Sequence, residues 1–247
     1  MAKQTSLLTF TGRLGDLIGY RRNDGYFIRS MPQAVRQTAA TRRAARRFGE
    51  ASKNGRLVRS AFAPALNIPC DGGHVNRLNK AFIAAGTNAP GALAGFRFNR
   101  HASTGTFFTV PPALSRNGIL RIPAQQLPQL KGIQQLEVKV IAARVHFAGR
   151  RVTGTDTAVM YIDPRLPFEG ASLPMEVPGE GTLVVTLQVR CFRDGALAGQ
   201  RAYMAADIIA VTAQQPRQAR PGRTYPHDTG KAGPPRIPGT CAIIQRE

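Results

Sequence analysis

The chain has 247 residues, of which 34 are lysine or arginine and 14 are aspartate or glutamate, so its formal net charge is +20. Its 43% hydrophobic residues can bury a sizeable core at this length, which excludes wholesale disorder. Because so large a charge opposes compaction, we expect a polyanionic partner, or another surface, that neutralises it.

The charge is unevenly distributed. Residues 1–60 hold 13 basic and 3 acidic residues and residues 213–247 hold 6 and 2, whereas residues 105–212 are near balance with 11 and 8. Arginine supplies 28 of the cations, and its planar guanidinium suits phosphate contact and stacking on bases. Codon bias in a GC-rich genome also explains the preference for arginine, but it does not explain the excess over acids.

A β-hairpin is predicted within residues 10–32. Two apolar and aromatic runs, 17–22 and 26–31, flank the turn sequence Asn23-Asp24-Gly25. Alternation puts one set of side chains on one side and a second on the other: Tyr20, Arg22, Phe27 and Arg29, against Arg21, Tyr26 and Ile28. A shift of one residue in register would exchange the two sets.

The aromatic and basic residues of this hairpin allow two interpretations of its role. Aromatic rings interleaved with arginines suit base stacking together with phosphate contact, and they suit equally the docking of the hairpin on a neighbouring domain or subunit. A hairpin of two strands is only marginally stable in water, so it needs something to lie against. Upstream, Gly12, Gly15 and Gly19 lack the pattern of a phosphate loop and indicate bends or close backbone contacts.

The best predicted helix begins at Thr38 or Thr41 and ends near Ala63. Its packing seam has helical spacing: Ala44, Phe48, Ala51, Gly55, Val58 and Phe62. The opposite side carries the cations Arg42, Arg43, Arg46, Arg47 and Lys53. Such a run can be a solvated face, but arginines four residues apart repel each other and an anionic surface would relieve that strain. Gly55, after Asn54, allows the alternative of two helices.

The N-terminal pattern Gly12-x2-Gly15-x3-Gly19, followed by Gly25, Arg29, Pro32 and a basic helix, resembles the opening of an uncharacterised family of small basic bacterial proteins. The resemblance covers about the first 60 residues. It implies a β-rich C-terminal half, and it assigns no catalytic or binding role to any residue.

A second helix is predicted over 73–85, with Gly86 as its C-cap. The strands expected after it are Thr106–Val110, Gly118–Ile122, Leu136–Ala148, Ala158–Ile162, Thr182–Phe192 and Arg201–Val211. In the strand 182–192 the alternation predicts one core-facing side, which includes Cys191. The fold class is therefore α+β, with an antiparallel β-sandwich or jelly-roll-like domain at its centre.

Four parts are predicted along the chain. They are a basic hairpin-plus-helix arm over 1–69, a short helix and linker over 70–104, the sandwich over 105–212, and a basic tail over 213–247. The tail is rich in proline and glycine, so we expect it to be extended and to order only on a partner.

The search for chemistry gives no catalytic residue, metal site or cofactor. The four histidines are far apart in the sequence, and Cys70-x3-His74 offers only two of the four ligands that a structural zinc site needs. The three cysteines are scattered and do not form a disulfide framework. We therefore predict that the chain is not an enzyme.

The prediction is a non-enzymatic structural or assembly protein, of the kind found in ribosomes or virions, that binds nucleic acid or another polyanion. The residues predicted to bind are Tyr20, Arg21, Arg22, Tyr26, Phe27, Arg29, Arg42, Arg43, Arg46, Arg47 and Lys53. One alternative is a self-assembling subunit of a phage particle or filament without a direct nucleic-acid role. Another is binding to an anionic membrane surface or cell-wall polymer.

The expected setting is the cytoplasm or the interior of a particle, because the sequence has neither a signal peptide nor an apolar run long enough to span a membrane. A homo-oligomer, or a subunit of a larger assembly, is the expected state. Deletion of residues 1–60 is expected to abolish polyanion binding and to leave the β domain folded.

Overall fold

A computed structural model describes residues 2–5, 8–32, 34, 37–86, 90–115 and 117–212. The fold is α+β, with antiparallel sheets, and it divides into two compact units, Met1–Ala45 and Arg46–Glu247. The predicted C-terminal tail, 213–247, lies outside the described residues.

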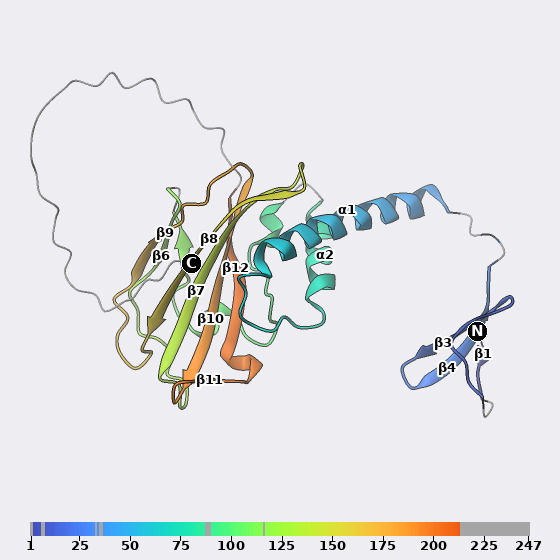
Figure 1. Ribbon diagram of the computed structural model, residues 1–247, viewed down its shortest axis with the longest axis horizontal. Coiled ribbons are helices and arrows are strands. Elements are labelled where there is room, and N and C mark those ends of the chain that lie inside the picture. The colour runs from blue at the N-terminus through green and yellow to red at the C-terminus, as the bar shows by residue number, and fades with distance from the viewer. Residues whose placement is uncertain are drawn as a thin grey trace, which may run out of the picture. The chain divides into compact units, whose positions relative to one another are not determined.

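The first unit is built on a four-stranded sheet in the order β1-β4-β3-β2, drawn in blue in Figure 1. Its strands are β1 (Ala2–Lys3), β2 (Gly12–Leu14), β3 (Leu17–Arg22) and β4 (Gly25–Ser30). The predicted hairpin is confirmed as β3 and β4, and Asn23 in its turn has a φ of 52°. The short strands β1 and β2 cover the two edges of the hairpin, which is the support that two strands alone would lack.

Helix α1 spans Ala39–Phe62 without a break at Gly55, so the alternative of two helices is wrong. Thr38 caps its start, since its Oγ1 accepts a hydrogen bond from the Thr41 N–H at 3.1 Å. Gly55 is needed where α2 (His74–Ala85) crosses, because a Cβ there would lie 2.6 Å from Oδ1 of Asn79. The predicted C-cap of α2, Gly86, is confirmed with a φ of 81°.

Two sheets form the β-rich part of the second unit. The three-stranded sheet has the order β5-β6-β9, and the five-stranded sheet has the order β11-β10-β7-β8, with β12 also paired to β10. The bounds are β5 (Ala113–Leu114), β6 (Ile119–Ile122), β7 (Gln135–His146), β8 (Arg151–Ile162), β9 (Ala171–Pro174), β10 (Thr182–Arg193), β11 (Ala196–Leu197) and β12 (Met204–Thr212).

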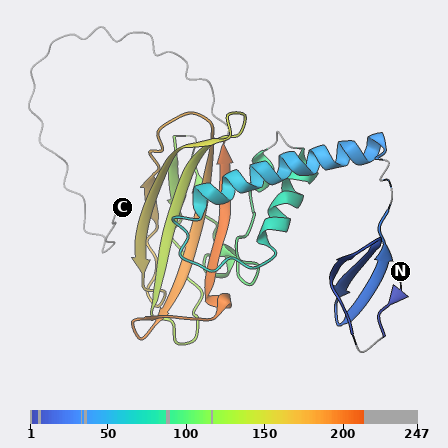
Figure 2. The ribbon, with the colours of Figure 1, turned by 45° about the vertical axis from the view of Figure 1, so that its right-hand side comes forward.

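The five-stranded sheet is covered on both faces, as Figure 2 shows. On one face, side chains of β7 and β10 share a hydrophobic cluster with Leu120 of β6 and Leu173 of β9. On the other face, Val184 and Ala206 share a second cluster with side chains of α1 and α2. The helices therefore belong to the core of the second unit.

The prediction that the strand 182–192 has only one core-facing side is wrong, because both faces of its sheet are covered. Val184, Thr186 and Gln188 are all fully buried, so the side expected to face solvent is inside the molecule. Helical packing against that side could not be seen in the strand's own alternation. Cys191 is a buried core residue as predicted, and burial raises the pKa of its thiol to about 12.

Other strand predictions differ in detail. The strand expected over Thr106–Val110 is wrong, because Thr104–Thr106 is a 3₁₀ turn whose Thr104 bonds to a buried carboxylate, and Phe107 and Phe108 reach the core from irregular chain. Residues Arg201–Tyr203 are also a 3₁₀ turn, and β8 begins seven residues before the predicted start. The short strands β5, β9 and β11 were not predicted. No helix among the described residues is long and apolar enough to cross a membrane.

Candidate functional site

The hairpin brings the predicted side chains together in the predicted sets. Tyr20 pairs with Phe27 and Arg21 pairs with Tyr26, so directly opposite residues share a face. One face therefore carries Tyr20, Phe27, Arg22 and Arg29, and the alternative register is wrong. The rings of Tyr20 and Phe27 are stacked, with their centroids 5.9 Å apart and their planes at 26°.

The sheet adds two cations that the sequence did not indicate. Lys3 of β1 pairs with Phe27, and Arg13 of β2 pairs with Ile18, so both lie on the face of the stacked rings. Their strands have only two and three residues, too few for a period to be recognised. The glycines around Arg13 were the available signal, since Gly12 and Gly15 both have positive φ and Gly15 lies in the turn between β2 and β3.

The opposite face of this sheet is crossed by the chain itself at one point, while Leu14 and Leu17 on that face stay exposed. Phe10 lies across the buried Gly19, where a Cβ would be 2.7 Å from the ring atom Cε2 of Phe10. The side chain of Gln4 holds this crossing, because it exchanges hydrogen bonds with the backbone of Phe10 and donates to the Phe27 carbonyl oxygen at 3.1 Å. Arg21 lies over the Tyr26 ring on this face, 5.8 Å from its centroid.

The first half of α1 is exposed. Of the predicted seam, Ala51, Gly55, Val58 and Phe62 are buried, but Ala44 and Phe48 are exposed, so the seam begins later than expected. The arginines predicted to bind are all exposed: Arg42, Arg43, Arg46 and Arg47. Arg42, Arg43 and Arg46 make no ion pair with any described residue.

Two of the predicted binding cations in α1 have partners. Arg47 donates from Nη2 to the carbonyl oxygen of Ile83 in α2 at 3.3 Å. Lys53 forms an ion pair with Glu50 at 3.0 Å, and Glu50 also contacts Arg150 at 3.1 Å. These partners leave Arg42, Arg43 and Arg46 as the helical cations best placed for an external anion.

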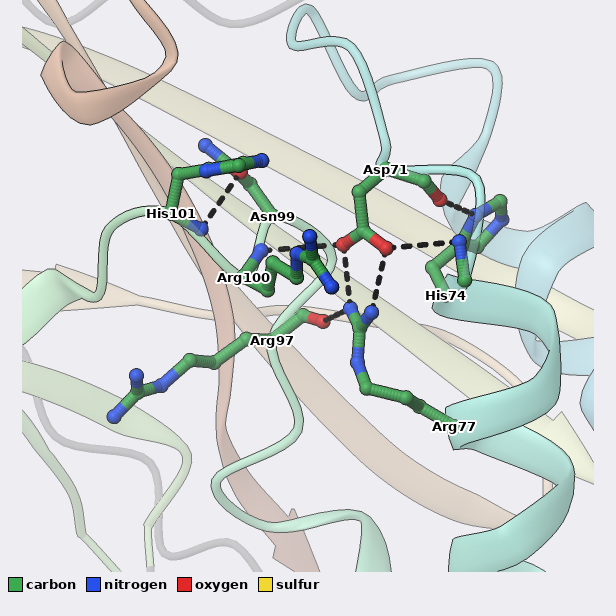
Figure 3. Close-up of polar contacts among 8 residues, drawn as sticks. Asp71, His74, Arg77, Arg97, Asn99, Arg100 and His101 are labelled. Carbon is green, nitrogen blue, oxygen red and sulfur yellow. Dashed lines mark hydrogen bonds and ion pairs between the residues drawn. The ribbon is translucent and has the colours of Figure 1, made fainter.

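A carboxylate near the start of α2 makes a network of hydrogen bonds with several chain segments (Figure 3). Asp71 accepts two hydrogen bonds from Arg77, at 2.6 and 2.7 Å, and further bonds from the backbone N–H groups of Gly73 and Arg100. Arg77 also donates to the carbonyl oxygen of Arg97 at 2.8 Å. The Arg77 guanidinium, with these backbone donors, holds the pKa of Asp71 well below its usual value.

This network is a structural clamp. Both carboxylate oxygens of Asp71 accept hydrogen bonds from donors of the protein itself. A carboxylate that stays ionised is also a poor general acid or base at neutral pH. The clamp joins α2 to residues 97–100, and Phe98 in that segment donates its N–H to Ala206 of β12 at 2.8 Å. It therefore attaches the helical layer to the edge of the sheet.

The residues Cys70 and His74 line an open pocket of about 370 Å³ together with Arg56 and Arg59. Burial raises the pKa of the Cys70 thiol, and the charge of Asp71 adds to this effect. No three His, Cys, Asp or Glu side chains lie close enough to share a metal ion within the described part of the chain. Cys70 and His74 thus have no third candidate ligand in that part.

Comparison with protein-family models, curated proteins and solved structures gives no significant match. The function must therefore be argued from the charges and contacts of the chain itself.

Proposed function

We propose that this protein is a non-enzymatic structural or assembly protein that binds nucleic acid. Its exposed arginines in the first half of α1, the cations of the N-terminal sheet and the basic tail 213–247 contact phosphates. The two facing sheets of the second unit serve as a sandwich-like scaffold. The role resembles that of ribosomal or virion proteins, in the cytoplasm or within a particle, and the protein works as an oligomer or as a subunit of a larger assembly.

The observation that carries the proposal is the set Arg42, Arg43 and Arg46. These side chains are exposed on a capped helix, and the described residues around them supply no acidic partner. Arg42 and Arg46 are one helical turn apart, so they repel each other in the free protein. Phosphate groups would remove that repulsion and accept guanidinium hydrogen bonds.

The test is a salt titration of binding to single- and double-stranded oligonucleotides. The triple variant Arg42→Gln, Arg43→Gln, Arg46→Gln should weaken binding and should reduce the slope of log affinity against log salt by about 2 to 3, according to the strand form. Helical content should not change, because glutamine and arginine have similar helix propensities.

A matched control removes the same charge from the β-rich part of the second unit, away from α1 in the sequence. Arg121, Arg151 and Arg201 are exposed and their side chains make no ion pair with a described residue. Their replacement by glutamine should leave affinity and slope near those of the parent protein. If both triple variants lose the same affinity, net charge alone explains the binding. If the parent protein does not bind at low salt, the proposal is wrong.

A second candidate is a self-assembling subunit of a phage particle or filament without a nucleic-acid role. It is favoured by β8, an edge strand of 12 residues that pairs only with β7 among the described strands. Native mass measurements on nucleic-acid-free protein test it. A large closed or filamentous assembly without oligonucleotide affinity would favour this candidate, and a strict monomer at high concentration would argue against it.

A further inference from the structure

The two faces of the N-terminal sheet differ in chemistry. On one face, the stacked rings of Tyr20 and Phe27 form a platform across β3 and β4, and each ring is only partly buried. A platform of two aromatic rings offers stacking area for about two bases. We call the face that carries these rings the ring face.

Four cations lie on the ring face around the platform. Each strand of the sheet supplies one of them: Lys3, Arg13, Arg22 and Arg29. All four are exposed. The register puts no carboxylate on the ring face, because the sheet's acidic residues, Asp16 and Asp24, lie in its two turns. The ring face therefore combines aromatic area with positive charge.

The opposite face has less of this combination. Its one cation on a described strand is Arg21, which lies over the Tyr26 ring, and Phe10 crosses it at Gly19. Leu14 and Leu17 on the opposite face are nevertheless exposed, and its Tyr26 is only partly buried. The two faces therefore differ in number: the described strands put one ring and one cation on the opposite face, and two rings and four cations on the ring face. Packing alone would not require this asymmetry in a sheet of four short strands.

We propose that the ring face binds unpaired nucleotides of single-stranded nucleic acid. Bases stack on Tyr20 and Phe27, and the flanking phosphates contact the four cations. A duplex is a poorer ligand, because its base faces are already stacked within the helix and only its phosphates remain available. The inference rests on the proposed function and names the strand form that this surface takes.

The test compares two strands with equal phosphate content. One probe is a deoxythymidine oligomer of about 12 nucleotides, and the other is an abasic strand of the same length. The parent protein should bind the thymidine strand about tenfold or more tightly than the abasic strand, because only the former can stack. The double variant Tyr20→Leu, Phe27→Leu should lose this preference and keep its affinity for the abasic strand.

Matched variants on the two faces locate the effect. Tyr26 was predicted from the sequence to bind, but it lies on the opposite face, so Tyr26→Leu should retain the preference. Tyr20→Phe should also retain it, because the ring is kept. The pair Arg22→Gln, Arg29→Gln should weaken binding of both strands by the same factor, since it removes phosphate contacts alone. Loss of the preference in Tyr26→Leu would overturn the assignment of the face.

One measurement needs no variant and covers the case in which the leucine pair fails to fold. In the parent protein, the thymidine strand should shift the ring-proton resonances of Tyr20 and Phe27 and leave those of Tyr26 unchanged. Equal affinity for thymidine and abasic strands would overturn base stacking and leave phosphate binding, hence the proposed function, intact. If neither strand nor a duplex binds at low salt, the proposed function itself fails.

Discussion

Among single residues, Asp71 gives the clearest dependence of stability on pH. Its folded-state pKa lies below the ordinary value of 3.8, chiefly because of the hydrogen bonds from Arg77. The resulting stabilisation is fully present above that ordinary value and is lost as the pH falls towards the folded-state pKa. We expect Asp71→Asn to lower the free energy of unfolding by about 2 kcal/mol at neutral pH and by less in acid. Urea unfolding at a series of pH values measures this.

The pKa of Asp207 is shifted in the opposite direction, so this residue serves as a control for Asp71. Burial raises the pKa of this carboxyl, and its Oδ1 finds no hydrogen-bond partner among the described residues, while Oδ2 accepts bonds from Thr104. Ionisation therefore costs stability as the pH rises through the raised pKa. Asp207→Asn should match or exceed the parent's stability at neutral pH and lose that advantage in acid. A common pH trend in the two variants would contradict both electrostatic assignments.

At the scale of elements, two glycines in α1 separate helix propensity from packing. Gly49 has open space where a Cβ would point, whereas a Cβ at Gly55 would meet the buried Asn79. Gly49→Ala should raise the free energy of unfolding by up to about 1 kcal/mol. Gly55→Ala should lower it by about 1 kcal/mol, because overpacking exceeds the gain in propensity. Denaturant unfolding of both variants checks this, and equal stabilisation would show that α2 moves aside without cost.

The packing of α1 also determines how much of the basic arm can be deleted while the second unit stays folded. The expectation that residues 1–60 are dispensable for folding conflicts with the burial of Ala51, Leu57 and Val58, which belong to the core of the second unit. Each large apolar side chain lost from such a core removes about 1.5–3 kcal/mol of burial. Deletion of residues 1–37, which keeps the Thr38 cap, should therefore preserve the cooperative unfolding of the second unit, and deletion of 1–60 should abolish it. Circular dichroism melts distinguish the two, and a folded product of the longer deletion would contradict this role of α1.

The elements that the sequence predicted well are those with local signals. The helical spacing of α1, the Gly86 cap and the Asn23-Asp24-Gly25 turn each depend on residues close in sequence. The hairpin's turn then fixed the register, and with it most of the candidate site. Some predictions failed, and some features were not predicted, where distant parts of the chain decide the outcome. The second covered face of β10 is an example of the former, and the placement of Lys3 and Arg13 by pairing with longer strands is an example of the latter.

For the molecule as a whole, the pairing of charge is more informative than its total. The ion pairs found among the described residues all lie in the second unit, and they include the pair of the buried Glu137 with the partly buried Arg190 at 2.6 Å. Residues 1–45 hold eight basic and two acidic residues. The net positive charge per residue is therefore higher in residues 1–45, where no described cation makes an ion pair, and this favours recognition of an external polyanion.

The two ends of the chain allow net charge to be separated from surface chemistry. Residues 1–37 and residues 213–247 each hold six basic and two acidic residues, so either deletion removes the same net charge. If charge alone governs binding, the two deletions should weaken binding equally for every strand form. Because the ring face lies within residues 1–37, we expect equal losses for a duplex and a larger loss for single strands when 1–37 is removed.

Fluorescence anisotropy at fixed ionic strength measures these four affinities, and ionic strength must be held constant because it scales the phosphate contribution. The absorbance of each purified protein gives a second readout, since a chain with no Trp and 5 Tyr absorbs weakly at 280 nm and bound nucleic acid raises its 260 nm signal conspicuously. If the 1–37 deletion lowers the affinity for single strands no more than the 213–247 deletion does, the N-terminal sheet contributes only its net charge to binding.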